Sequence, residues 1–175
     1  MKIFNLHTTY KKILADHITP VNIYLKLRDI FPNSLLLENS DYRANDNSFS
    51  YICCNPIASV ENGSITQKFP DGNTEISDAS PETVTKTVHN FSNRFNSDLK
   101  EDFKFITNGI FGYTNYDAVK YFEDIEISHK DNSINTPEIY YAVYQNVIAI
   151  SHYKNEAYIF SHSADGNHNV EKVLQ

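Results

Sequence analysis

The sequence predicts an α+β fold in one domain that spans residues 1–175, with layered antiparallel β-sheets and a few flanking helices. Three observations favour this class. β-forming segments follow one another with hairpin-type connections, only a few helical patterns are set between them, and the chain is rich in aromatic residues, with 12 Tyr and 11 Phe. Tyrosine suits half-buried sheet faces, because its ring packs inward while its hydroxyl reaches water.

The first part of the chain predicts two strands with a helix between them. Residues 4–13 mix apolar and polar β-formers and are expected to form a strand. Thr19 is placed to cap a helix whose first turn contains Pro20. Apolar residues then recur at helical spacing until Pro32 and Asn33 end the helix. This stripe consists of Val21, Tyr24, Leu25, Leu27 or Arg28, and Phe31. Residues 35–37 are expected to be a short buried strand.

The next segment predicts a polar loop followed by a hairpin. Residues 40–48 are polar and form the expected loop, and a strand from Phe49 to Cys54 should end at Pro56. Residues 58–69 predict a hairpin, because Asn62-Gly63 supplies the two positive-φ residues of a type I′ turn. Residues 70–73 form a further turn.

The second half predicts another helix and a long strand pair. Ser80-Pro81-Glu82 repeats the cap chemistry of the first helix, and its apolar stripe consists of Val84, Val88, Phe91 and Phe95. Residues 103–113 are expected to be a strand and residues 116–122 a short helix. Residues 138–150 and 157–162 predict two antiparallel strands joined near residues 153–156. Residues 167–175 begin a helical pattern without a closing cap, which favours a chain truncated inside a larger protein.

The charge balance excludes several classes of partner. With 15 Lys and Arg against 22 Asp and Glu, the formal charge is -7, so nucleic acid and anionic membranes are disfavoured partners, since both require a basic face. The N-terminus lacks the features of a signal peptide, and we expect a soluble cytoplasmic protein.

Neither cysteines nor histidines indicate a metal or nucleophile site. Cys53 and Cys54 are adjacent, so on a strand they point to opposite faces and are expected to be buried, reduced thiols. The seven histidines occur without metal-ligand spacing, and most of them are expected to be solvated or at strand edges. Gly109 and Gly112 lack the spacing of a phosphate loop and predict a close approach of backbones or a bulge instead. Glu38-Asn39, just after a short strand, has groups that can bind an ammonium ion, although charged residues at strand ends more often only meet water.

Several motifs together resemble a known family. Asp16-His17-Ile18-Thr19-Pro20-Val21, followed by Tyr24-Leu25-Lys26-Leu27, is similar to the D-x-x-T-P-V…Y-x-K-L opening of anthranilate synthase large subunits. Leu35-Leu36-Leu37-Glu38-Asn39 resembles the L-L-E-S element of that family, and Phe49-Ser50-Tyr51-Ile52…Asn55-Pro56 resembles its Y-S-F-I-G-x-x-P strand. The segment from Gly109 to Glu123 is similar to G-x-x-G-Y-x-x-Y-D-x-V-R-x-x-E, and Pro137 also fits. The matches keep the family's order from residue 16 to residue 162.

The resemblance implies the N-terminal part of the large-subunit fold. In the family, the whole subunit binds chorismate and Mg²⁺ and, with ammonia from a glutamine amidotransferase partner, forms anthranilate and pyruvate. The chorismate and metal ligands lie in a C-terminal chorismate-binding domain that this sequence does not contain. We therefore expect no catalytic residue and no metal ligand in this chain, and no activity from these 175 residues alone.

The resemblance further implies a regulatory site for tryptophan. Carried over, Leu37 would pack on the indole, Glu38 would pair with the α-ammonium group, Asn39 would stand where the family has Ser, and Ser50 would line the same wall. Ser48 stands where many members have Arg, and Cys53 where they have Gly. Two alternatives remain: the equivalent part of aminodeoxychorismate synthase, and a purely structural or interaction domain without a ligand.

Overall fold

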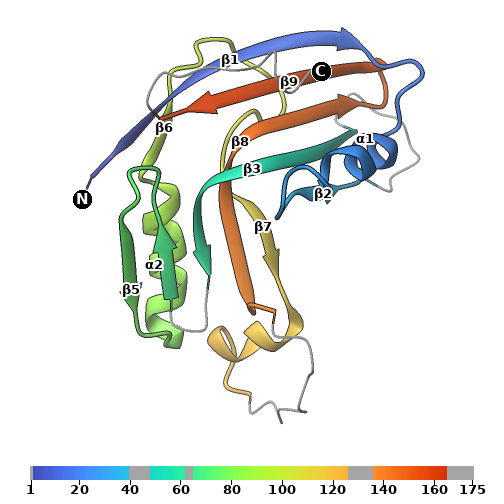
Figure 1. Ribbon diagram of the computed structural model, residues 1–175. Helices are drawn as coiled ribbons and strands as arrows, with labels where there is room; N and C mark the ends of the chain where they lie inside the picture. Colours follow the sequence, from blue (N-terminus) through green and yellow to red (C-terminus); the bar gives the residue numbers. More distant parts are fainter. Residues whose placement is uncertain (1, 40–47, 62–64, 126–135, 165–175) are drawn as a thin grey trace.

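The computed structural model describes residues 2–39, 48–61, 65–125 and 136–164, and these residues form one strongly bent sheet with helices against it (Figure 1). The elements in chain order are β1 (Phe4–Leu14), α1 (Pro20–Leu27), β2 (Leu35–Leu37), β3 (Phe49–Glu61), β4 (Ile65–Lys68), β5 (Thr74–Ser77), α2 (Pro81–Ser92), β6 (Phe95–Ser97), β7 (Phe111–Thr114), the 3₁₀ helix η1 (Tyr116–Tyr121), β8 (Ile139–Ser151) and β9 (Glu156–Ser163).

The sheet confirms the predicted α+β class. Within the described part of the chain its strand order is β5-β4-β3-β8-β9-β1-β6, with β2 added to β3 and β7 added to β8. The expectation of purely antiparallel sheets needs one correction, because β6 pairs in parallel with β1. That pairing follows from α2, which carries the chain back across the sheet before β6 begins (Figure 1).

β3 and β8 are the two longest of the described strands, and they curve side by side where the sheet bends (Figure 1). The prediction that Pro56 ends the strand at Cys54 was wrong. Asn55 adopts a positive φ of 60° and the pairing with β8 shifts register between Pro56 and Ala58, so the strand continues to Glu61 through a bulge. A bulge is one of the few places in a sheet where a proline, which has no N–H to donate, is tolerated.

Helix α1 has the predicted cap but is shorter than predicted. The Thr19 side chain accepts from the Asn22 backbone N–H, and the helix ends at Leu27 instead of near Phe31. Beyond Leu27 the chain continues as turns, in which the Ile30 and Phe31 N–H groups both donate to the Leu27 carbonyl. Ile23, Tyr24 and Leu27 pack on a core of isoleucines from β3, β8 and β9, whereas Val21 and Leu25, part of the predicted stripe, are exposed.

The strand predicted at residues 35–37 is present as β2, but it is not buried. β2 pairs with β3 over Leu35–Cys53, Leu36–Ile52 and Leu37–Tyr51, and the Leu37 side chain is 37% exposed. Three consecutive leucines predicted an inner strand, but β2 lies at the edge of the sheet, where one flank of the strand meets solvent.

Helix α2 closes the other end of the sheet over an apolar cluster. Val84 and Phe91 are buried against Phe4 and Phe69, and Ser80 and Thr83 form a capping box. Phe95 was expected on the same helix, but the helix ends at Ser92 and Phe95 begins β6. β5 was not predicted, because all four of its side chains are exposed and carry no apolar pattern.

The strand predicted over residues 103–113 is mostly irregular. Only Phe111–Thr114 is a strand, β7, while Phe103 and Phe105 pack their rings on Tyr158 and Phe160 of β9. The segment therefore covers the sheet face instead of joining the sheet.

Other predictions were confirmed. The short helix at residues 116–122 is η1, the strands β8 and β9 pair as expected, and β3 pairs with β4 as the predicted hairpin. The loop at residues 40–47, the Asn62-Gly63 turn and the helical pattern at 167–175 lie outside the described residues. No helix in the described ranges is long and apolar enough to cross a membrane.

Candidate functional site

The predicted site residues lie where β2 ends beside β3. Leu37 is the last residue of β2, Glu38 and Asn39 follow it, and Ser50 is on β3. The side chains of Glu38 and Asn39 are exposed, whereas Ser50 is fully buried. The carboxylate of Glu38 is thus accessible to a ligand from solution.

A set of hydrogen bonds holds the end of β2. The backbone N–H of Asn39 donates to Ser50 Oγ at 3.3 Å, and Asn39 Nδ2 donates to Ser48 Oγ at 3.5 Å. Ser50 Oγ also lies 2.7 Å from His152 Nε2, and the His152 backbone N–H donates to the Ser48 carbonyl at 3.1 Å. Four residues from three parts of the chain therefore form one polar cluster.

The structure brings some of the predicted residues together and separates others. Asn39 and Ser50 are in contact. Leu37 pairs with Tyr51, and because neighbouring residues on a strand point to opposite faces, Leu37 lies on the Tyr51 side of the sheet and Ser50 on the other. A ligand bound by Leu37 and Glu38 would therefore reach around the edge of the sheet, and Ser50 would act through Asn39.

Ser50 and His152 have the spacing of a nucleophile and its general base, but not the access. A catalytic hydroxyl must meet its substrate, and the Ser50 side chain is fully buried. Its oxygen already accepts from Asn39 and needs only His152 to complete its hydrogen bonds. The pair is therefore structural. His152 was not singled out from the sequence, since it becomes relevant only when β8 brings it next to β3.

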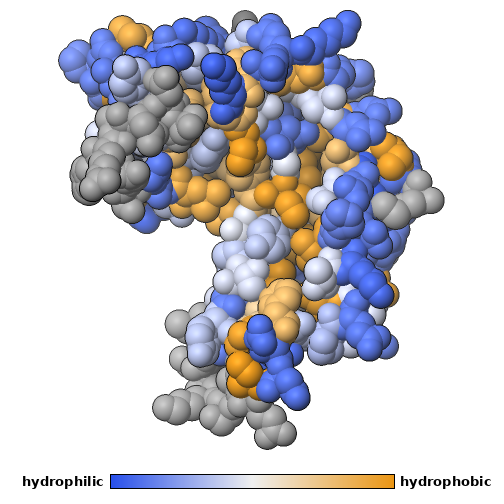
Figure 2. All heavy atoms as spheres, turned by 180° about the vertical axis from the view of Figure 1, so that it is seen from behind, coloured by the Kyte–Doolittle hydropathy of each residue, from blue (hydrophilic) through white to orange (hydrophobic). Residues whose placement is uncertain are grey.

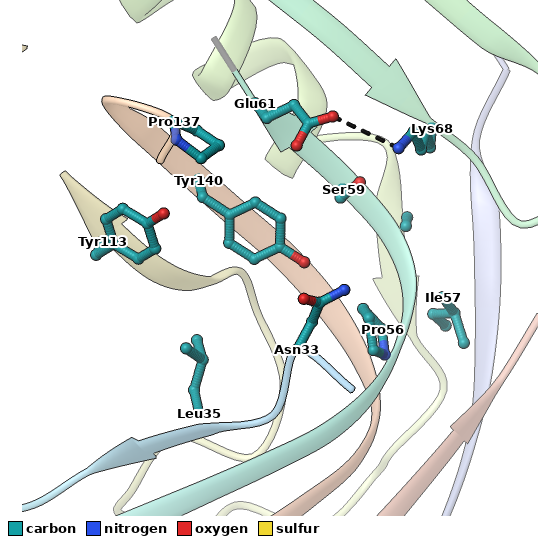
Figure 3. Close-up of a pocket in the computed structure, with 11 residues that line it drawn as sticks. Asn33, Leu35, Pro56, Ile57, Ser59, Glu61, Lys68, Tyr113, Pro137 and Tyr140 are labelled. Carbon is teal, nitrogen blue, oxygen red and sulfur yellow. Dashed lines mark hydrogen bonds and ion pairs between the residues drawn. The ribbon is translucent and has the colours of Figure 1, made fainter. Parts of the chain in front are cut away.

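A cavity of about 400 Å³ opens beside the start of β2 (Figure 3). Its walls come from β2, β3, β4, β7 and β8, and the lining residues include Leu35, Pro56, Tyr113, Pro137 and Tyr140. Glu61 and Lys68 form an ion pair at one end, with 3.5 Å between Oε1 and Nζ. Seen from behind, apolar side chains gather where the molecule is hollowed (Figure 2). The size and lining suit a small molecule or one buried side chain.

The cavity is connected to β2 through tyrosine side chains. The Tyr144 hydroxyl donates to the carbonyl of Asn33 at 3.0 Å, and Asn33 holds a positive φ of 61° just before β2. Tyr140 lines the cavity, and burial raises the pKa of both the Tyr140 and the Tyr144 phenol. Both hydroxyls therefore stay protonated at neutral pH.

Two further expectations from the sequence concern the cysteines and the histidines. Cys53 and Cys54 are free and buried, which confirms the prediction of reduced core thiols. Most histidines were expected to be solvated or at strand edges, and His162 is an exception: it is fully buried between Thr8 and the Thr107 carbonyl. Among the described residues, no group of three or more His, Cys, Asp or Glu side chains could hold a metal ion.

The chain is similar in sequence to two curated proteins. It is 34% identical over 171 residues to anthranilate synthase component 1 of Lactococcus lactis subsp. lactis strain IL1403, covering 94% of this chain and 34% of that protein. It is 26% identical over 166 residues to anthranilate synthase component 1 of Acinetobacter calcoaceticus, covering 91% of this chain and 33% of that protein. This chain is a relative of the N-terminal region of anthranilate synthase component 1. No family model matches it.

The relationship to anthranilate synthase component 1 covers a part of that protein. The chain spans about a third of the length of the curated relatives that it matches. Among solved structures, anthranilate synthase component I from Streptococcus pneumoniae TIGR4 matches with a TM-score of 0.47 and 19% identity, over 94% of this chain and 34% of that one. The two curated relatives confirm the resemblance read from the motifs at the level of the component 1 family.

Proposed function

We propose that this chain is the regulatory, tryptophan-binding part of an anthranilate synthase component 1. As a whole, such a protein would convert chorismate and ammonia to anthranilate and pyruvate in the cytoplasm. Its Mg²⁺ would be held by a C-terminal chorismate-binding domain, and its ammonia would come from a glutamine amidotransferase subunit. Both curated relatives are anthranilate synthases, which favours this function over the aminodeoxychorismate alternative.

One observation carries the regulatory proposal. An exposed carboxylate, Glu38, stands next to a backbone that the Asn39–Ser50 hydrogen bond holds in place. A carboxylate is the ordinary partner of an α-ammonium group, and a fixed backbone lowers the entropy lost on binding. Leu37, which is 37% exposed at the edge of the sheet, offers apolar surface to an indole ring.

Regulation would follow from differential binding. If tryptophan binds one arrangement of the two parts of the enzyme more tightly than the other, its binding shifts the population toward that arrangement. A site at an edge strand suits this role, because an edge can contact a second domain while the rest of the sheet stays fixed.

Binding of free L-tryptophan can be tested by its own fluorescence, because the chain has no tryptophan residue. Because the chain contains no Trp, indole emission in a binding assay comes only from added ligand. We expect the fluorescence anisotropy of L-tryptophan to rise when the chain is titrated in. Glu38→Gln, which removes the charge and keeps the shape, should weaken binding at least about tenfold, as loss of a charge-assisted hydrogen bond does.

The matched control is Glu123→Ala, which removes an exposed carboxylate after η1. It should bind tryptophan as the wild type does. Equal binding by the Glu38→Gln and wild-type chains would reject Glu38 as the ammonium partner. An unchanged anisotropy with the wild-type chain would reject tryptophan binding by this part of the protein.

A further inference from the structure

β2 is a weak element on its own. It has three residues and, among the described strands, pairs only with β3. Edge strands with few backbone hydrogen bonds open at low free-energy cost. A carboxylate just beyond such a strand would move with it unless side chains from elsewhere held the backbone.

Side chains hold β2 at both ends. Before the strand, Tyr144 of β8 donates its hydroxyl to the carbonyl of Asn33 at 3.0 Å. After the strand, Ser50 Oγ of β3 accepts from the Asn39 backbone N–H at 3.3 Å. Both bonds are made to main-chain atoms, so they fix the path of the backbone on either side of Leu35–Leu37.

The second of these bonds depends on His152. Rotation about the Cα–Cβ bond moves a serine Oγ between staggered positions, and a hydrogen bond to a fixed partner holds the oxygen in one of them. Here that partner is His152 Nε2 at 2.7 Å, and the residue comes from 102 positions further along the chain. The His152 backbone is itself fixed, because its N–H continues the β3–β8 ladder by donating to the Ser48 carbonyl. Without the ring, the buried Ser50 hydroxyl would turn toward another acceptor and loosen its contact with Asn39.

We propose that His152 is a positioning residue for the amino-acid site: through Ser50 it fixes the backbone of Asn39 and so places the carboxylate of Glu38. This inference rests on the proposed function, because it concerns the same site. His152 touches no ligand in this scheme. The affinity for the amino acid would therefore depend on the backbone at the end of β8. The same strand also lines the cavity, through Tyr140.

The test combines tryptophan binding with a readout that needs no ligand. In the anisotropy assay, His152→Ala and Ser50→Ala should each weaken binding about tenfold, the effect of losing one buried hydrogen bond. The double variant should bind no more weakly than either single variant, because both act through one contact. His152→Gln, whose amide can accept from Ser50, should restore much of the loss. The control is His89→Ala, an exposed histidine on α2.

Amide hydrogen exchange of Asn39 supplies the second readout. Exchange should be faster in His152→Ala than in the wild type and unchanged in His89→Ala. If Glu38→Gln weakens binding while His152→Ala binds normally, the positioning role is overturned and the proposed function stands. If the wild-type chain binds no tryptophan, the proposed function is rejected. The exchange rate of the Asn39 amide then tests the positioning role alone. An unaltered rate in His152→Ala would show that His152 does not fix the Asn39 backbone.

Discussion

Gly112 on β7 lies directly against the backbone of Tyr140 on β8. A Cβ at Gly112 would stand 1.9 Å from the Tyr140 carbonyl oxygen and 2.7 Å from Tyr141 Cα. Atoms cannot approach so closely, and the obstructing atoms belong to a strand that is paired on both sides. The pairing of β7 with β8, and with it the Tyr113 wall of the cavity, therefore requires glycine at this position.

Gly112→Ala should destabilise the chain by about 2–3 kcal/mol, because the two strands must separate to admit the methyl group. The free energy of unfolding in urea measures this. Gly72→Ala is the comparison: no atom lies within 4 Å of its Cβ, and the cost comes only from its φ of +81°, about 1 kcal/mol. A loss in Gly112→Ala no larger than that in Gly72→Ala would contradict the steric argument.

The sequence predicted the role of this glycine but not the extent of its strand. Two glycines in an apolar run indicated a close backbone approach, which Gly112 makes. The same run also looked like a continuous strand from Phe103. Phe103 and Phe105 instead bury their rings on the face of β9, a use of apolar residues that alternation cannot distinguish from strand pairing.

In the candidate site, the sequence predicted the contiguous residues but not the ones that come from distant parts of the chain. Leu37, Glu38 and Asn39 are contiguous, so a short motif was enough to propose them. Tyr144 and His152, which hold β2 at its two ends, are distant in sequence and carry no motif. Their role depends on the register of β3 and β8, in which Ser50 pairs with Ile150 and Pro56 with Tyr144, and no short motif in the sequence specifies that register.

His162 should make the stability of the chain pH-dependent. Its Nε2 donates to the Thr107 carbonyl and its Nδ1 accepts from the Thr8 hydroxyl, so the structure holds the neutral ring. Burial lowers the pKa of His162 from 6.5 to about 4. Above pH 6.5, the ordinary pKa of the group, the His162 ring is mostly neutral in both the folded and the unfolded chain. As pH falls toward 4 only the unfolded state gains the proton, and stability falls by about 1.4 kcal/mol per pH unit, about 3 kcal/mol in all.

The measurement is the free energy of unfolding of wild type and His162→Gln from neutral pH down to about pH 4. Glutamine does not titrate, so the difference between the two proteins should shrink as the pH falls. The subtraction also removes the carboxylates that titrate in the same range, including Asp98, whose pKa is lowered by the Thr8 backbone N–H. Parallel curves for the two proteins would show that His162 is not the group responsible.

Arg94 should resist replacement even by lysine. Its side chain is 8% exposed, its Nη1 contacts both carboxylate oxygens of Glu75 at 2.9 and 3.0 Å, and its guanidinium carbon lies 3.8 Å from the centroid of the Phe69 ring. Lysine keeps the charge but loses the planar group that stacks and donates in two directions. Arg94→Lys should therefore cost about 1–2 kcal/mol.

The control for this change is Arg28→Lys, since Arg28 is exposed and pairs with Asp29 at the surface. Exposed ion pairs contribute little, so its effect should stay within about 0.5 kcal/mol. Thermal unfolding of the two variants against wild type provides the comparison. Equal melting temperatures for the two variants would mean that the stacking on Phe69 contributes nothing.

Cys53 and Cys54 should be unreactive until the chain unfolds. Both are fully buried on β3, and burial raises the pKa of Cys54 to about 11 and that of Cys53 further. Because the thiolate is the reactive form, both access and ionisation oppose labelling. Ellman's reagent at mildly alkaline pH should therefore titrate no thiol rapidly in the native chain and both in denaturant. One fast equivalent in the native chain would show that β3 opens locally before its irregularity between Pro56 and Ala58. Cys54→Ala would then remove that signal, while Cys53→Ala would leave it.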